Sequence, residues 1–377
     1  MTKVTMVGCD LHDRSMLLRY SVGNGQVQQL CYDNDASGRR RMIARIRAIA
    51  KKHKSNRIFF AYEASGLGYG LCDQLYDAGI ECHVLSPALL PTTPKSAKLK
   101  TDAKDAQMIL EHVRAHVLAG NALAAVWTPP QRLRDDRELI RARVDVADEI
   151  TRVKLRIGSM FKRRGMKITG PTKSRWTQAF VRHLRDVVIP TLDYAVGIKL
   201  RLLLDRLEMY FRERNELDKA VKQLSQEDRY QVSCRELQKL PGVGPLVAMT
   251  FLTEMGDLLR FHNRREVAAY LGLCPSCHES GEKNDRKGRI TRQGPARLRK
   301  MLCQAAWVSI GKGECEQARE TYHRIRQNQK HRTKKALVAL MRKLGIRMWH
   351  VALYCGVSTE LQGRGGPHGL EETCTST

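Results

Sequence analysis

Acidic residues are scarce in this chain compared with basic ones. It has 39 Asp and Glu against 66 Lys and Arg in 377 residues, which gives a formal net charge of +27. Residues 151–175 and 322–347 each contain nine Lys or Arg and no acidic residue. A field of this size attracts polyanions and releases their counterions on binding, so the charge favours a nucleic-acid partner.

Long apolar runs are also missing. The chain has no run of 18 apolar residues and no lipidation signal, which argues against a membrane partner. It enters a predicted strand directly after Lys3, so we expect no signal peptide and a cytoplasmic protein. With 42% hydrophobic residues, a chain of this length is expected to form two or three domains with real cores.

Cysteine pairs at zinc-site spacing are nearly absent. Eleven cysteines are scattered along the chain, and Cys274 and Cys277 form its one Cys-x-x-Cys pair. His262 and His278 could complete a zinc site in principle, but no second pair lies at the usual spacing, so zinc is disfavoured. In a reducing compartment we expect these thiols to be mostly reduced.

Against this basic background, four acidic residues stand out by position. Asp10 and Glu63 each close an apolar run that predicts a strand, and Asp102 and Asp105 lie three apart at the start of a predicted helix. Carboxylates that converge repel one another unless a hard cation lies between them. The pattern therefore predicts a Mg²⁺ site and phosphoryl transfer on nucleic acid. His12 could reach this site, although a strand-end histidine is the simpler interpretation.

The order of predicted elements divides the chain into three parts and a tail. Residues 1–128 predict strands followed by strand–helix alternation, the layout of an RNase H-like, or RuvC-like, mixed-sheet nuclease domain. Residues 129–231 predict long helices, and residues 232–360 a mainly helical C-terminal domain. Residues 361–377 are rich in glycine and are predicted to be disordered. The fold class is thus α/β followed by α.

Heptad spacing in the helical part leaves two arrangements open. Leu139, Val146, Val153 and Met160 recur every seven residues, and a second series runs from Leu203 to Leu224. The pattern predicts either an antiparallel pair within one chain or a coiled coil between chains.

Several basic and glycine residues are candidate nucleic-acid contacts. Gly242 and Gly244 lie in a Leu-Pro-Gly-Val-Gly turn typical of a helix–hairpin–helix motif, whose backbone amides can face a phosphate. The remaining candidates are basic residues of the stretches without acids and of the region after residue 288. They are Arg152, Lys154, Arg156, Lys162, Arg163, Arg164, Arg289, Arg292, Arg297, Arg299, Lys334 and Lys335.

Ser280 is a candidate nucleophile. It precedes Gly281, which allows close approach to its hydroxyl, and arginines that could stabilise a pentavalent phosphate follow it. An ordinary loop serine among nucleic-acid-binding arginines is the alternative, since an activated serine needs a base that spacing does not identify.

Seven motifs in order resemble those of DEDD-type transposases of the insertion-sequence 110 family. The resemblance covers about residues 4–355. The motifs are Gly8-Cys9-Asp10, Glu63-Ala64-Ser65-Gly66, Lys100-Thr101-Asp102-Ala103-Lys104-Asp105-Ala106, Leu240-Pro241-Gly242-Val243-Gly244, Tyr270-Leu271-Gly272-Leu273-Cys274-Pro275, Glu279-Ser280-Gly281 and Arg289-Ile290-Thr291-Arg292-Gln293-Gly294.

The resemblance implies a prokaryotic, nucleoid-associated recombinase. It implies that Asp10, Glu63, Asp102 and Asp105 hold Mg²⁺ and that Ser280 forms a phosphoserine link with DNA. It further implies target and donor DNA as substrates, a noncoding bridge RNA as guide, and a dimer or tetramer in which one subunit's acids meet another's serine. Two rival functions remain: a RuvC-like junction endonuclease that uses metal and water, and a non-catalytic nucleic-acid-binding scaffold.

Overall fold

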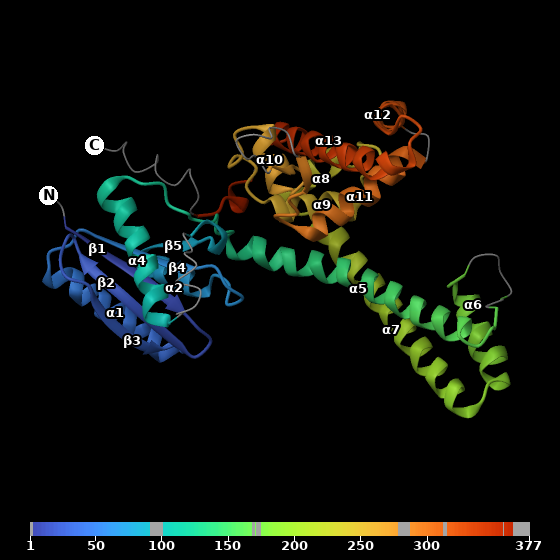
Figure 1. Cartoon of the computed structure of the whole chain (residues 1–377). Coiled ribbons are helices and arrows are strands. Elements are labelled where there is room, and N and C mark those ends of the chain that lie inside the picture. The colour runs from blue at the N-terminus through green and yellow to red at the C-terminus, as the bar shows by residue number, and fades with distance from the viewer. Residues whose placement is uncertain are drawn as a thin grey trace. The chain divides into compact units, whose positions relative to one another are not determined.

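The computed structural model describes residues 3–90, 101–167, 170, 175–277, 287–311, 315–356 and 358–364. The chain divides into two compact units (Figure 1). The first comprises residues 1–129 and the segment from Gly363 onward, and the second comprises residues 130–362. The predicted helical part and C-terminal part thus belong to one unit.

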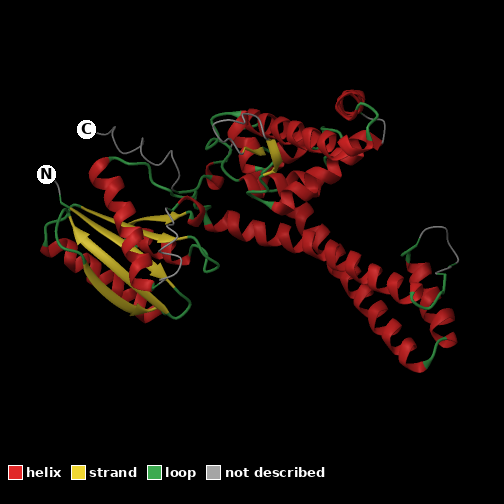
Figure 2. Cartoon of the chain, in the orientation of Figure 1, coloured by secondary structure: helices red, strands yellow, loops and turns green. Residues whose placement is uncertain are grey.

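The first unit is built on a mixed five-stranded sheet (Figure 2). The strand order is β3-β2-β1-β4-β5, in which β1, β2 and β3 are antiparallel neighbours and β4 and β5 run parallel to β1. This is consistent with the RNase H-like domain predicted from the sequence. The elements are β1 (Val4–Leu11), β2 (Ser15–Val22), β3 (Gln28–Asp33), α1 (Ala36–Lys52), β4 (Arg57–Glu63), α2 (Gly70–Asp77), β5 (Glu81–Leu85) and α4 (Asp102–Ala119).

Both faces of the sheet are buried, because its central strands are apolar at nearly every position. Val7 and Phe60 pack with α1 and α2 on one face. Met6 and Phe59, which precede them by one residue and so point the other way, pack under α4. The helices α1 and α2 therefore cover one face and α4 covers the other.

Gly8 lets α4 lie directly on β1. A Cβ atom at this position would lie 2.4 Å from the backbone nitrogen of Leu110 and 2.6 Å from the carbonyl oxygen of Ala106. Any side chain would therefore meet the backbone of α4, which cannot give way as a flexible side chain can. This close approach fixes the distance of α4 from the sheet, and with it the position of the N-terminus of α4.

The second unit is mostly helical. Its long helices α5 and α7 pack against each other in antiparallel fashion, with Arg143 in the first half of α5 paired to Asp218 near the end of α7. The heptad residues Val153, Met160 and Leu203 share one buried cluster within the chain. The elements are α5 (Gln131–Lys162), α6 (Gln178–His183), α7 (Tyr194–Leu224), α8 (Asp228–Leu237), α9 (Pro245–Met255), α10 (Arg264–Tyr270), β6 (Pro275–Cys277), β7 (Lys287–Ile290), α11 (Ala296–Gly311), α12 (Glu316–Arg326) and α13 (Thr333–Tyr354).

The structure thus pairs the two heptad series within one chain. The sequence predicted a disordered tail from residue 361, and the structure describes its first residues, 361–364. Leu361 is buried. Arg364 forms an isolated β-bridge with Thr128 through the backbone, and its guanidinium group stacks on the ring of Tyr76. Residues 365–377 lie outside the described residues.

Replacing Gly8 with Ala is expected to destabilise the first unit by about 1–3 kcal/mol, the usual cost of overpacking a site with no room to relax. Thermal or urea unfolding measures this change. Gly70→Ala is the matched control, because a Cβ atom there meets only the end of the Arg39 side chain, at 3.9 Å. Equal stabilities for the two variants would contradict the packing constraint.

Candidate active site

Asp10 and Glu63 lie at the same end of the sheet and on the same face. Their strands run parallel, and each residue directly follows the last pair of the register between β1 and β4. An even number of positions separates each from a residue packed under α4, namely Met6 for Asp10 and Phe59 for Glu63. Strand alternation therefore turns both carboxylates toward the face that α4 covers.

The start of α4 supplies the other two carboxylates. Thr101 is the N-cap residue, and its side chain accepts a hydrogen bond from the backbone N–H of Lys104 at 3.4 Å. Asp102 and Asp105 follow in the first turn. Three positions apart, they share one face of the helix.

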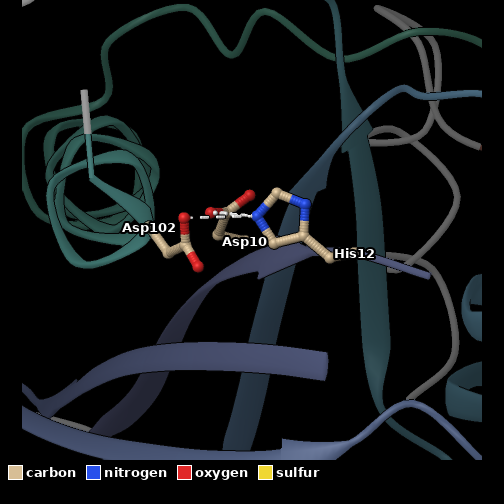
Figure 3. Close-up of side chains that lie close together, drawn as sticks. All are labelled: Asp10, His12 and Asp102. Atoms are coloured by element: carbon tan, nitrogen blue, oxygen red, sulfur yellow. Dashed lines mark hydrogen bonds and ion pairs between the residues drawn. The ribbon is translucent and has the colours of Figure 1, made fainter. Parts of the chain in front are cut away.

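Asp10, His12 and Asp102 converge (Figure 3). The Nε2 atom of His12 lies 3.1 Å from Oδ2 of Asp10 and 3.4 Å from Oδ1 of Asp102. One ligand atom from each of the three residues lies within 4.8 Å of the others. Two carboxylates and an imidazole form a donor set that suits a divalent cation.

The electrostatics of Asp10 reflect this crowding. Burial raises the pKa of its carboxyl group, His12 lowers it, and the charges of Asp102 and Asp105 raise it again. Asp105 thus acts on Asp10 electrostatically although it lies outside the three-residue group. Among the described residues, Glu63 also lies outside that group. The structure brings the predicted acids to one end of the sheet but gathers only two of them tightly.

His12 is the residue that the sequence interpretation undervalued. It was predicted to be a strand-end histidine, and the structure places its ring between two of the predicted metal ligands. The sequence signal was the spacing of His12 from Asp10. Asp10 is the last residue of β1 on the face that α4 covers, and His12 lies two residues further along, just beyond the strand. A residue two positions from a strand-end carboxylate continues on the same side of the chain.

The candidate contacts on α5 differ in their surroundings. Arg156, Lys162 and Arg163 are exposed. The ammonium group of Lys154 lies 5.8 Å from the centre of the Trp176 ring and 5.3 Å from that of Phe211, and burial lowers its pKa. Two further arginines bond locally: Arg152 pairs with Glu149, and Arg164 donates to the carbonyl oxygen of Met160.

The turn that the sequence predicted to be a helix–hairpin–helix motif joins α8 to α9. Gly244 is the N-cap residue of α9 and has open space where a side chain would be. Gly242 has a φ of 79°, and a Cβ atom there would lie 2.3 Å from the carbonyl oxygen of Ala305. Packing against α11 therefore requires glycine at position 242, whatever the turn binds.

Two candidate arginines of helix α11 make ion pairs or hydrogen bonds within the chain. Arg297 forms a two-pronged ion pair with Asp145 of α5, at 2.9 and 2.7 Å. Arg299 donates to the carbonyl oxygens of Leu271, Gln293 and Gly294.

The remaining candidates of this region are exposed or not described. Arg289, Arg292, Lys334 and Lys335 are exposed. Ser280 lies outside the described residues, as do His278 and Glu279.

The first unit has the sheet order of an RNase H-like domain and carries an acidic group at the carboxyl end of its parallel strands. These features define a class of DNA-processing proteins, and comparison with known proteins agrees. A family described as "Transposase" of the DEDD type of IS110 matches residues 7–164, and "Transposase IS116/IS110/IS902 family" matches residues 234–323. The chain belongs to this family of transposases.

Individual relatives support the assignment. The chain is 30% identical to the "Putative transposase y4qE" of Sinorhizobium fredii over 87% of this chain and 78% of the relative. It is 24% identical to the "Transposase for insertion sequence element IS1533" of Leptospira borgpetersenii, over 81% of this chain and 86% of the relative. A "Pilin gene-inverting protein" of Moraxella bovis is 34% identical over 29% of this chain and 33% of the relative. No helix in the described part of the chain is long and apolar enough to cross a membrane.

His12 is expected to contribute a nitrogen ligand when a divalent cation binds, because its Nε2 atom lies beside two carboxylate oxygens. With Mn²⁺ as the probe, electron spin-echo spectroscopy should detect a coupled imidazole nitrogen in the wild type and not in His12→Gln. His53, exposed after α1, provides the control His53→Gln, which should keep the coupling. An unchanged spectrum in His12→Gln would show that the ring only hydrogen-bonds to the carboxylates.

Proposed function

We propose that this transposase cuts and rejoins target and donor DNA by divalent-metal-dependent phosphoryl transfer at Asp10, Glu63, Asp102 and Asp105. Ser280 is the nucleophile that forms a phosphoserine link with DNA. Membership of the transposase family supports DNA as the substrate.

The observation that carries the proposal is the convergence of Asp10, His12 and Asp102. Three elements of the chain (β1, the loop after it, and α4) meet there to place negative charge and a nitrogen donor together. Burial of Asp10 makes an unneutralised carboxylate unfavourable at this position. A binding scaffold has no use for such an arrangement, so the group favours catalysis over plain binding.

Each residue of the site has its own role in this proposal. A bound Mg²⁺ would stabilise the charge that develops on the transferred phosphate. Asp10 and Asp102 would provide oxygen ligands for it, and His12 would provide a nitrogen ligand from the loop after β1. Glu63 lies beside Asp10 on the next strand, where it can orient a water molecule or provide a further oxygen ligand.

The covalent step balances without an outside energy source. The hydroxyl oxygen of Ser280 forms a bond to phosphorus and gives its proton to water, while the bond from phosphorus to the departing deoxyribose oxygen breaks and that oxygen takes a proton from water. In rejoining, a DNA hydroxyl group displaces the serine oxygen in the reverse sense. One phosphoester bond replaces another at each step, so no nucleotide triphosphate is needed.

Guidance by a noncoding bridge RNA and assembly into a dimer or tetramer rest on the family resemblance. The positive charge of the chain is compatible with an RNA as well as a DNA partner. In this proposal, base pairing with the RNA selects target and donor DNA, while the protein contacts backbone and shape.

A metal-dependent junction endonuclease is the second candidate, because the same acidic group would serve it. That enzyme would use water in place of Ser280 as the nucleophile. Its products would be free DNA ends, whereas the proposed transposase passes through a protein–DNA adduct and joins strands.

Asp105→Asn is expected to reduce DNA strand cleavage at least about 100-fold, because electrostatic stabilisation at the reacting phosphate is a large catalytic contribution. Cleavage of a labelled junction substrate in the presence of Mg²⁺ measures it. Asp77→Asn, an exposed acid in the last turn of α2, is the control and should retain full activity. Full activity in Asp105→Asn would remove this carboxylate from the site.

Ser280→Ala is expected to abolish the covalent adduct with DNA while leaving DNA binding unchanged, because only the hydroxyl group is removed. Denaturing electrophoresis of the reaction with labelled DNA detects the adduct. Ser276→Ala, in strand β6 of the same region, should form it normally. An adduct that persists in Ser280→Ala would assign the nucleophile elsewhere, and cleavage without any adduct in the wild type would favour the endonuclease.

A further inference from the structure

The helix α1 has a uniformly basic outer face. Residues 36–56 contain eight Lys or Arg and no acidic residue. Its buried positions, including Met42, Ile46 and Ile49, pack into the core of the first unit, so the basic residues are left on the outside. We call the exposed side, with Arg40, Arg41, Arg45, Arg47, Lys51 and Lys52, the basic face of α1.

The basic face has an ordered layout. Helical periodicity of 3.6 residues per turn sorts its residues into two rows. Arg40, Arg47 and Lys51 form one row, at spacings of seven and four. A second row, at spacings of four and seven, contains Arg41, Arg45 and Lys52.

A strip of small residues lies between the two rows. Ser37, Ala44 and Ala48 occupy it, and all three are exposed. Nothing on this strip projects far beyond the helix surface, so a ligand can approach the helix closely there while both rows of cations reach around it.

Some cations of α1 are tied down within the chain and others are not. Arg39 donates to Asn34, Arg41 pairs with Asp33 at 3.4 Å, and Arg47 donates to the carbonyl oxygen of Ala78. Among the residues that the structure describes, no ion pair joins an acid to the other four. These are Arg40, Arg45, Lys51 and Lys52.

Local stability does not account for the arginines near the start of α1. The N-terminus of a helix carries partial positive charge, so acids are favourable in the first turn and cations are not. Asp35 caps the N-terminus of α1, but the first turn has no acidic residue, and Arg39, Arg40 and Arg41 follow one another at its end. Lys51 and Lys52 lie in the last turn, where the dipole favours cations. The three consecutive arginines near the start of α1 oppose the helix dipole and repel one another, so their charge indicates an anionic partner outside the chain.

The basic face begins close to the candidate active site. Asn34, just before α1, donates through its side chain to the carbonyl oxygen of His12 at 2.7 Å. The backbone N–H of Asn34 donates to the carbonyl oxygen of Arg14 in the same loop. The Nε atom of Arg39 donates a hydrogen bond to the side-chain oxygen of Asn34, at 2.7 Å. The helix therefore starts beside the loop that carries His12 and leads away from it.

We infer that the basic face of α1 binds duplex DNA, with its two rows of cations on the phosphates of the two strands. An α-helix fits the major groove of B-form DNA, which is about 12 Å wide. The major groove of duplex RNA is deep and narrow, so the same two rows could not straddle it. The 17 residues of α1 extend over about 25 Å, long enough to follow several base pairs.

The inference rests on the proposed function only for DNA as the substrate. It assigns a DNA-binding surface that is separate from the candidate contacts in the second unit. The same unit thus carries the carboxylates on one face of its sheet and a DNA-binding surface on the helix that covers the other face.

The test removes the four cations that pair with none of the described acids, in the variant Arg40→Gln/Arg45→Gln/Lys51→Gln/Lys52→Gln of the full chain. Binding to a short labelled DNA duplex is followed by fluorescence anisotropy over a range of salt concentrations, without divalent cations. We expect the affinity to fall about 10- to 100-fold. The slope of log affinity against log salt should become shallower by about one for each phosphate that the variant no longer neutralises.

A charge-matched control separates this surface from the overall charge. Arg201, Arg206, Arg212 and Lys219 are exposed on α7, where acidic residues are interspersed with them. Replacing these four with Gln should change affinity and slope less than the α1 variant does. Circular dichroism establishes that both variants are folded.

Three results would overturn the inference: an unchanged salt slope in the α1 variant, an equal fall in affinity in the α7 variant, or a fall seen with an RNA duplex but not with DNA. Because binding is measured without divalent cations, none of these results bears on strand cleavage. Conversely, an inactive serine or carboxylate would leave binding at α1 intact, so the two proposals fail separately.

Discussion

The candidate active site depends on one contact between two backbones, where α4 lies on β1 at Gly8. No side chain separates them, so the helix sits closer to the sheet than packed side chains would allow. Asp10 follows two residues later on β1, and Asp102 begins the same helix about one turn before the contact. Because both lie within a few residues of a rigid contact, their carboxylates have little freedom to separate. The repulsion between them is a cost that the fold imposes and that a cation relieves.

The sequence was sufficient to predict the sheet and the position of its acids. Apolar runs ended by Asp10 and Glu63 predicted strands, and a strand fixes the side on which each residue lies. Parallel pairing of β1 and β4 then places both residues at one end of the sheet. These are local rules, and they hold here because both faces of the sheet are buried and a shifted register would expose apolar residues to water.

Tertiary contacts determine the interactions of several candidate residues, and these contacts could not be predicted from the sequence. Charge alone marked Arg297 and Arg299 as candidate DNA contacts, but an acid from α5 and three backbone carbonyl groups occupy them. Gly242 matched a phosphate-binding turn, and packing against α11 already explains it. In most of these cases the partner lies far away in the sequence, so spacing gives no sign of it. The sequence analysis noted that His12 could reach the site but favoured a strand-end histidine, because the contact of its ring with Asp102 is a tertiary one.

An acidic site for a polyanionic substrate raises a problem of attraction. In the proposed function, the carboxylates of Asp10 and Asp102 repel the phosphates of the DNA, and a bound cation would offset this repulsion only at short range. A longer-range attraction has to come from fixed positive charge nearby. The basic face of α1 supplies it from the opposite face of the same sheet, joined to the site through Asn34 and the loop of His12. Attraction and chemistry are thus divided between two faces of one sheet, so each can carry the charge that its task requires without neutralising the other.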